Sequence, residues 1–191
     1  MSEITLENKT KEFRELIEKI SRQNVNACYQ CLKCSAGCPM ADEMDYTPAQ
    51  IIHAIRLGLE DYVITSGTIW VCVSCETCST RCPQGVDIAH IMDAARNIAY
   101  RRGINPPAES REISDFYTVA LNNIRAYGRM YELGLVLGHK IKTGDYFKDM
   151  KLGMKMGLKG KLKLLPARIR NVKAIDKIFK KVSEIEEKEK V

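Results

Sequence analysis

All eight cysteines of this 191-residue chain lie in two short runs of the same pattern. The first run reads CYQCLKCSAGCP over residues 28–39, and the second reads CVSCETCSTRCP over residues 72–83. In each run three cysteines follow at steps of three, and a fourth comes four residues later, directly before a proline. At this spacing one loop can surround a compact metal group and direct three thiolates toward it. Soft thiolates favour iron–sulfur clusters or zinc over magnesium or calcium.

The spacing is typical of the bacterial ferredoxin run that holds [4Fe–4S] clusters, so the two runs predict two such clusters. In two-cluster ferredoxins the fourth cysteine of each run ligates the other cluster. The predicted ligand sets are therefore Cys28, Cys31, Cys34 and Cys82 around one cluster, and Cys72, Cys75, Cys78 and Cys38 around the other. Structural zinc is the weaker alternative, because its ligands usually come in two well-separated pairs. Disulfides rank lower still in a cytoplasmic chain.

No other part of the sequence predicts a place to transform a substrate. It contains no glycine fingerprint for a nucleotide, no spare cysteine and no serine elbow. His53, His90 and His139 have no ligand partners in the sequence pattern and are read as surface or boundary histidines. The chain is thus predicted to pass electrons and to carry no catalytic residue.

The elements that must position the cysteines are predicted to be helices, which makes the fold class all-α. Apolar residues recur at helical spacing before the first run and after both runs. Thr47 and Pro48 predict the start of one helix, and Gly58 its end. Asp87 predicts the start of another, which Gly103 ends. A cysteine run followed by a helix therefore occurs twice, as an internal duplication.

The predicted organisation has three parts: a helical arm over residues 1–27, a cysteine-rich core over 28–103 and a helical extension over 104–191. Within the extension, residues 148–181 hold 12 Lys+Arg against 2 Asp+Glu, a net charge of +10. We expect this segment to dock on partner subunits; the alternatives are a solvated basic tail or binding to a membrane surface. The charged N-terminus and the lack of a long apolar run predict a cytoplasmic protein with no transmembrane segment.

The 33 residues between the runs, from Pro39 to Val71, read as helical. This pattern resembles the α-helical ferredoxin domain of iron–sulfur subunits in fumarate reductases, glycerol-3-phosphate dehydrogenases and heterodisulfide reductases. The stretch TIWVCVSCETCSTRCPQGVDI and the long helical tail resemble the C-subunit family of methanogen CoB–CoM heterodisulfide reductases. The resemblance covers residues 25–105 well and the tail more loosely.

That resemblance implies partners and a role in methanogenesis. A flavin-bearing partner, the A subunit of that family, would supply electrons. Another partner with CCG motifs, the B subunit, would reduce the CoM-S-S-CoB disulfide. A hydrogenase is a further candidate in a larger complex. The chain has no CCG sequence of its own, which agrees with a relay role.

Two other interpretations stay open at the level of sequence. One is an iron–sulfur subunit of a fumarate-reductase-like or glycerol-3-phosphate-dehydrogenase-like complex. The other is a nucleic-acid-binding protein with structural clusters, in which the basic segment contacts phosphates. We expect the relay, and hence no nucleic-acid partner.

Overall fold

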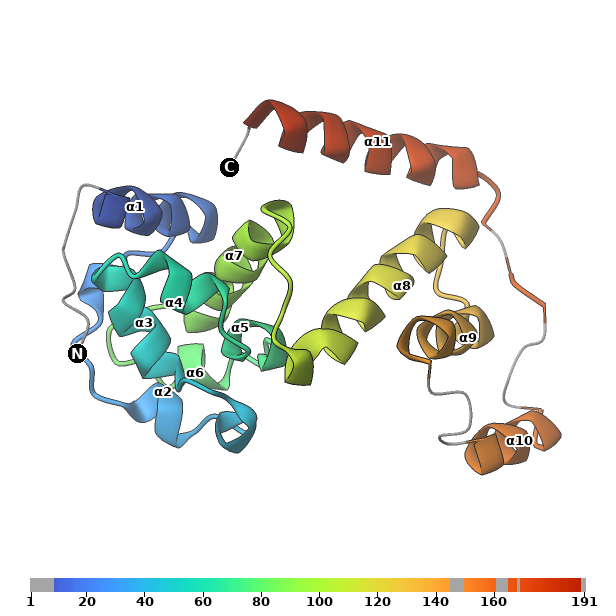
Figure 1. Cartoon of the computed structure of the whole chain (residues 1–191), viewed down its shortest axis with the longest axis horizontal. Helices are drawn as coiled ribbons and strands as arrows, with labels where there is room; N and C mark the ends of the chain where they lie inside the picture. Colours follow the sequence, from blue (N-terminus) through green and yellow to red (C-terminus); the bar gives the residue numbers. More distant parts are fainter. Residues whose placement is uncertain (1–8, 145–149, 161–164, 168, 190–191) are drawn as a thin grey trace. The chain divides into compact units, whose positions relative to one another are not determined.

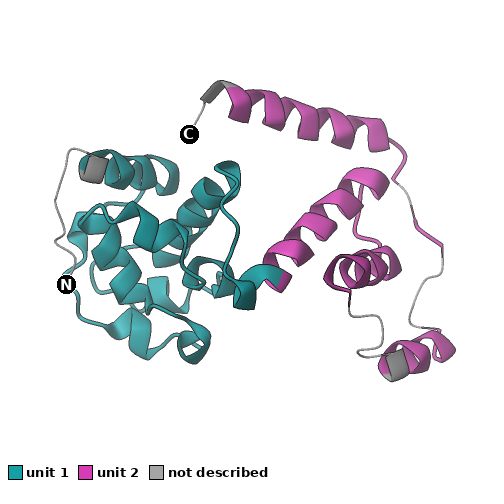
Figure 2. Ribbon diagram, viewed as in Figure 1, with its two compact units in different colours: residues 1–111 teal, residues 112–191 magenta. Residues whose placement is uncertain are grey.

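A computed structural model of the chain describes residues 9–144, 150–160, 165–167 and 169–189. Every regular element in these ranges is a helix, as the sequence predicts (Figure 1). The chain divides into two compact units, residues 1–111 and 112–191 (Figure 2). Both cysteine runs lie in the first unit, so this unit contains every candidate ligand. The predicted boundaries after residues 27 and 103 stay predictions.

Helix α1 (Lys9–Ser21) precedes the first cysteine run. Its Phe13 and Ile17 are fully buried, and the helix packs against α3 (Pro48–Arg56) and α7 (Ile88–Arg101). The Ser21 hydroxyl donates to the Ile17 carbonyl at the end of the helix. Helix α1 therefore packs the N-terminal part of the described chain against α3 and α7.

The two helices that follow the cysteine runs begin where the sequence predicts. Helix α3 starts with Pro48 after a capping box, in which the Thr47 side chain and the Gln50 side chain satisfy each other's backbone N–H groups. Helix α7 starts after Asp87, whose carboxylate accepts the N–H of His90. Each helix is followed by a glycine in the left-handed region, Gly58 at φ 68° and Gly103 at φ 66°.

Short helices connect the long helices of the first unit, and two of them contain the third cysteine of a run, Cys34 or Cys78. These short helices are η1 (Val25–Ala27), α2 (Lys33–Ala36), η2 (Ala41–Glu43), α4 (Glu60–Ile64), α5 (Thr68–Val71), α6 (Thr77–Thr80) and η3 (Ala108–Ser110). Helices α2 and α6 lie within the two cysteine runs and pack against each other. The side chain of Arg81 lies over Gly37, where any added side chain would have to displace it.

The core of the first unit consists of aliphatic side chains from α3 and α7, with contributions from α1, α4 and α5. Its fully buried large residues are Phe13, Ile17, Val25, Ile51, Ile52, Ile55, Val63, Thr68, Ile69, Ile91, Met92 and Ile98. The helical spacing of apolar residues places Ile51, Ile52, Ile55 and Leu59, and Ile88, Ile91, Met92, Ala95 and Ala99, on the inward faces of the two helices. All of these are buried except Leu59, which lies beyond the end of α3 and is only half-buried.

The second unit contains α8 (Arg111–Tyr127) from its second residue onward, α9 (Glu132–Thr143), α10 (Met150–Leu158) and α11 (Val172–Glu189). The buried Asn123 of α8 fixes the turn into α9, because its amide accepts the Tyr131 N–H at 2.7 Å and donates to the Tyr131 carbonyl at 3.0 Å. Arg125 of α8 pairs with Asp176 of α11 at 2.7 Å.

Helix α11 begins at Val172, where the side chain of Asn171 accepts the N–H of Ala174 and caps the helix. Of the basic segment 148–181, residues 148–149, 161–164 and 168 lie outside the described residues, as do residues 1–8 of the predicted N-terminal arm.

Candidate metal centres

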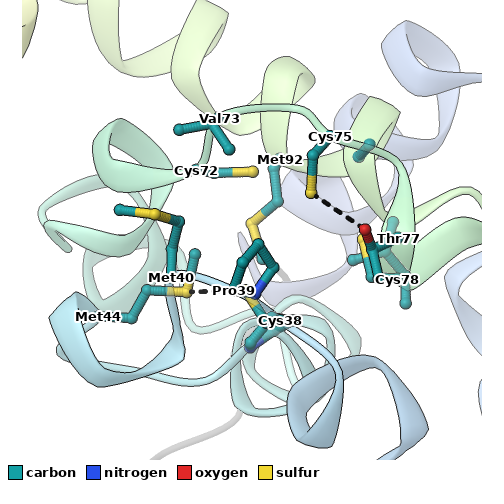
Figure 3. Close-up of a pocket in the computed structure, with 13 residues that line it drawn as sticks. Cys38, Pro39, Met40, Met44, Cys72, Val73, Cys75, Thr77, Cys78 and Met92 are labelled. Carbon is teal, nitrogen blue, oxygen red and sulfur yellow. Dashed lines mark hydrogen bonds between the residues drawn. The ribbon is translucent and has the colours of Figure 1, made fainter.

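The structure brings the eight cysteines into two groups of four, and each group contains cysteines from both runs. One pocket, called here the Cys72 pocket, is lined by Cys72, Cys75, Cys78 and Cys38 (Figure 3). The other, called the Cys28 pocket, is lined by Cys28, Cys31, Cys34 and Cys82. Each group has the composition of one predicted ligand set, three cysteines from one run and the last from the other.

The N-termini of α3 and α7 reach both pockets. Pro48, Ile88 and Ala89 line the Cys72 pocket, and Ala49 and Ile88 line the Cys28 pocket. A helix N-terminus carries a partial positive charge, which stabilises negative charge placed near it. Both pockets are therefore suited to an anionic group held by four thiolates.

Left-handed backbone shapes the two cysteine loops in the same way. Gln30 and Leu32 in the first run have φ of 61° and 65°, and the equivalent Ser74 and Glu76 in the second have 49° and 59°. Non-glycine residues rarely adopt this region, so four such residues in two equivalent loops indicate a conformation that the surrounding structure imposes. It turns the first three thiols of each run toward one pocket.

An arginine from each long helix holds the start of a run. Arg56 of α3 donates from Nη1 to the Cys28 carbonyl at 2.9 Å. Arg96 of α7 donates from Nη2 to the Cys72 carbonyl at 2.6 Å and from Nε to the Ile69 carbonyl at 2.7 Å. The two arginines occupy the same position in their helices, so the duplication extends to these contacts.

A serine after the third cysteine of each run caps the following helix. The Ser35 hydroxyl accepts the N–H of Ala49 at 3.1 Å, and the Ser79 hydroxyl accepts the N–H of Ala89 at 3.3 Å. Each serine oxygen also lies near the preceding cysteine sulfur, at 3.9 Å from Cys34 and 4.0 Å from Cys78. The cysteine loops and the helix N-termini are thus joined by direct hydrogen bonds.

Asp45 connects the end of the first run to the approach to the second. Its carboxylate accepts the N–H groups of Gly67 and Thr68, each at 2.8 Å, and the Thr68 hydroxyl at 2.5 Å. Partial burial alone would raise the pKa of Asp45, but these hydrogen bonds outweigh it and lower the pKa. The anion therefore caps α5, which carries the buried Trp70 and leads directly to Cys72.

Burial lowers the acidity of three of the cysteine thiols. It raises the pKa of Cys78 to about 11 and also raises the pKa of Cys34 and Cys72. A hydrogen bond with Thr77 instead lowers the pKa of the exposed Cys75. Because metal ligands must be thiolates, a metal group entering either pocket must displace protons from these sulfurs.

The donors and their surroundings fit an iron–sulfur cluster. Each pocket offers four soft sulfur atoms, and the Cys72 pocket adds the apolar side chains of Met40, Met44 and Met92 (Figure 3). In the described part of the chain, no three His, Cys, Asp or Glu side chains are arranged to hold one metal ion.

Comparison with known proteins agrees with this geometry. Residues 24–86 match the 4Fe-4S dicluster domain family, over a range that includes all eight cysteines. This part of the chain is a 4Fe-4S dicluster domain. The dicluster domain binds two [4Fe-4S] clusters, as the spacing of its cysteines predicts. Which cysteine ligates which cluster stays a prediction.

The chain is also similar to curated C subunits of heterodisulfide reductases. It is 41% identical over 96 residues to the iron-sulfur C subunit of the CoB--CoM heterodisulfide reductase of Methanopyrus kandleri, which is 48% of this chain and 50% of that protein. It is 37% identical over 101 residues to the C subunit of the H(2):CoB-CoM heterodisulfide,ferredoxin reductase of Methanothermobacter marburgensis, or 53% of this chain and 55% of that protein. The matched region thus spans about half the length of these relatives.

A longer alignment extends the similarity beyond the dicluster domain. It joins the chain to an iron-sulfur C subunit of the CoB--CoM heterodisulfide reductase of Methanocaldococcus jannaschii, with 33% identity over 121 residues, 63% of this chain and 64% of that protein. The resemblance to the C-subunit family, first drawn from the sequence, is confirmed by these matches.

Several residues of the dicluster domain escaped the sequence analysis. Arg56, Arg96, Ser35 and Ser79 hold the cysteine loops, yet each type is common on protein surfaces and carries no spacing signal alone. Aligning the two runs with each other pairs Ser35 with Ser79, since both follow the third cysteine, whereas the two arginines lie outside the runs and at different distances from them. By contrast, His53 and His90 are exposed, and neither lines a cysteine pocket.

Proposed function

We propose that this chain is the electron-relay subunit of a heterodisulfide reductase complex. It passes single electrons through two [4Fe–4S] clusters from a flavin-bearing subunit to the subunit that reduces the CoM-S-S-CoB disulfide. The observation that carries the proposal is the pairing of two four-cysteine pockets around a shared Ile88. Because the two pockets share a lining residue, clusters held in them would be neighbours, which supports electron transfer from one to the other.

The ligand sets belong to the same proposal. Cys28, Cys31, Cys34 and Cys82 hold the first cluster, and Cys72, Cys75, Cys78 and Cys38 hold the second. The division of the cysteines between the two pockets supports this assignment. A cluster changes oxidation state by one electron while its thiolates keep their positions, so the chain's own task is to hold the sulfurs, exclude water and keep the clusters adjacent.

The chain itself carries no catalytic residue in this proposal. All eight cysteines are used as ligands, which leaves no thiol to attack a disulfide. Disulfide reduction requires two electrons, and the relay delivers them one at a time to a partner that holds the intermediate. The names of the similar subunits favour the heterodisulfide over the fumarate or the glycerol-3-phosphate complexes.

The test is anaerobic purification of the chain alone and within its native complex. The isolated chain should show reducible cluster signals but no reduction of the heterodisulfide with an artificial donor. In the complex, Cys75→Ser should block electron flow from the flavin, while the disulfide-reducing subunit still turns over when it is reduced directly. A comparable rate of disulfide reduction by the isolated chain would refute the relay. Co-purification without a flavoprotein would refute the assigned complex.

A further inference from the structure

The two cysteine pockets follow the same plan, but they differ in the hydrogen bonds that reach their sulfur atoms. Hydrogen bonds to cluster sulfurs and nearby positive charge stabilise the reduced, more negative form and raise the reduction potential. Because the two runs are duplicates, each position in one run has a counterpart in the other. The duplication therefore provides an internal comparison of the two environments.

The first difference lies between Gln30 and its counterpart Ser74. The amide Nε2 of Gln30 donates to the sulfur of Cys28 at 3.4 Å. The hydroxyl of Ser74 instead donates to the carboxylate of Asp93 at 2.8 Å. At this loop position, the Gln30 side chain therefore donates a hydrogen bond to a cysteine sulfur of the Cys28 pocket. The hydroxyl of its counterpart Ser74 donates its one proton to a carboxylate, and therefore to no sulfur of the Cys72 pocket.

The second difference concerns the capping serines. Ser79 has a single hydroxyl proton, and it donates this proton to Asp87 at 2.7 Å. Ser35 instead accepts the Ala49 N–H and lies beside the sulfur of Cys34, so its hydroxyl can donate to that cysteine when it is a thiolate. A second donor therefore serves the Cys28 pocket where its counterpart is occupied elsewhere.

A backbone N–H group and nearby charges also differ between the two pockets. The N–H of Val86 donates to the sulfur of Cys82 at 3.4 Å, and Lys33 lines the Cys28 pocket. The Cys72 pocket has one hydroxyl beside a sulfur, that of Thr77 at 3.4 Å from Cys75, which offsets part of this difference. The neighbour of Cys38 is the thioether of Met44 at 4.0 Å, which has no proton to donate. Met40 and Met44 both line the Cys72 pocket, and the chain between them contains the acidic residues Asp42 and Glu43, whose negative charge disfavours the reduced form of a cluster nearby.

We propose that the cluster in the Cys28 pocket has the higher reduction potential of the two, and that the Gln30 amide is a positioning and tuning residue for it. In the relay proposed above, on which this direction rests, an electron leaves the cluster in the Cys72 pocket and reduces the cluster in the Cys28 pocket. The donor subunit then approaches the exposed Cys75, and the acceptor approaches the exposed Cys31.

The test is a redox titration of the anaerobically purified full-length chain, followed by electron paramagnetic resonance. Cys31→Ser and Cys75→Ser, which change counterpart ligands, identify the signal of each cluster. The signal altered by Cys31→Ser should be the one that is reduced at the higher potential in the wild-type chain. If the signal altered by Cys75→Ser has the higher potential, the proposed order is wrong.

Gln30→Met tests the tuning residue, because it keeps the length of the side chain and removes the donor. It should lower the potential of the cluster marked by Cys31→Ser and leave the other unchanged. The matched control is Ser74→Ala, which removes a hydroxyl bonded to Asp93 and should shift neither potential. An unchanged potential in Gln30→Met would overturn the role of Gln30. If that variant does not load its clusters, the wild-type order still decides the proposal.

These outcomes are independent of the relay itself. The order of the potentials is measured on the chain alone, whereas the relay fails only if the chain reduces the disulfide or if its complex lacks the expected partners. A further pair of variants tests the ligand assignment independently of the order of the potentials and of the relay. Cys82→Ser should alter the same signal as Cys31→Ser, and Cys38→Ser the same signal as Cys75→Ser.

Discussion

The Nη2 of Arg96 lies 2.6 Å from the carbonyl oxygen of Cys72 and donates a hydrogen bond to it. The same guanidinium bonds the Ile69 carbonyl and pairs with Asp93 at 3.2 Å. Helix α7 thereby holds α5 at Ile69 and at its C-cap Cys72, where the second cysteine loop begins. The geometry of this loop depends on a residue far outside the cysteine run.

Arg96→Leu should destabilise the dicluster domain, because it leaves the Ile69 and Cys72 carbonyls without these donors. Loss of a partner for a buried polar group costs about 1–3 kcal/mol. The measurement is anaerobic chemical denaturation followed through cluster absorbance. Arg56→Leu is the matched control, since Arg56 makes one such bond to Cys28, and it should cost less. Equal effects of the two variants would contradict the role assigned to Arg96.

Asp45→Asn should also lower the free energy of unfolding, by about 1 kcal/mol, because a neutral amide accepts the Gly67 and Thr68 N–H groups more weakly than a carboxylate. The pKa of Asp45 is lowered in the folded chain, so its contribution is complete above the unfolded pKa and is lost only as the pH falls through the lower folded value.

The pH dependence of this variant checks that sign. The stability difference between wild type and Asp45→Asn should stay constant from about pH 8 to pH 5, where the carboxylate is ionised in both folded and unfolded chains. A difference that disappears on approaching pH 5 would show that the carboxyl has a raised pKa. Asp42→Asn, an exposed neighbour in η2, is the control and should leave stability nearly unchanged.

Chemical analysis of the anaerobically purified chain should approach about eight iron and eight sulfide per molecule, since the dicluster domain holds two [4Fe–4S] clusters. Cys78→Ser should reduce both numbers, because it removes a ligand from one pocket. Zinc without sulfide in the purified chain would contradict the cluster assignment.

Removal of residues 146–191 should leave both clusters in place, because every cysteine lies in the first unit. It should weaken assembly with partner subunits, since it deletes the basic segment 148–181 with its net charge of +10. The binding affinity of the full chain should also fall with added salt, and that of the shortened chain should fall less. Unchanged assembly would show that the segment does not dock on partner subunits. Loss of the clusters would show that the first unit needs residues 146–191 to hold them.

The described residues contain no helix that is both long and apolar enough to cross a membrane. The cytoplasmic location expected from the sequence stays a prediction.

The sequence alone determined the cofactor type and most of the long helices. Cysteine spacing is a local property, because three of the four predicted ligands of each cluster lie within seven residues of one another. The starts of α3 and α7 are also local, since Thr47 and Asp87 cap their helices through bonds to residues only three positions away. Such short-range contacts are visible as motifs.

Only the tertiary structure decided which groups surround the cysteines. Arg56 reaches back 28 residues to Cys28, and Asp45 reaches forward 22 residues to Gly67. Neither spacing has a period or a composition that marks it, because contacts between distant segments arise from packing of the core. The acceptors of Gln30 and Ser74 were also decided by the tertiary structure. The two duplicated loops have equivalent backbones, and the side chains packed around each loop determine where its donor points.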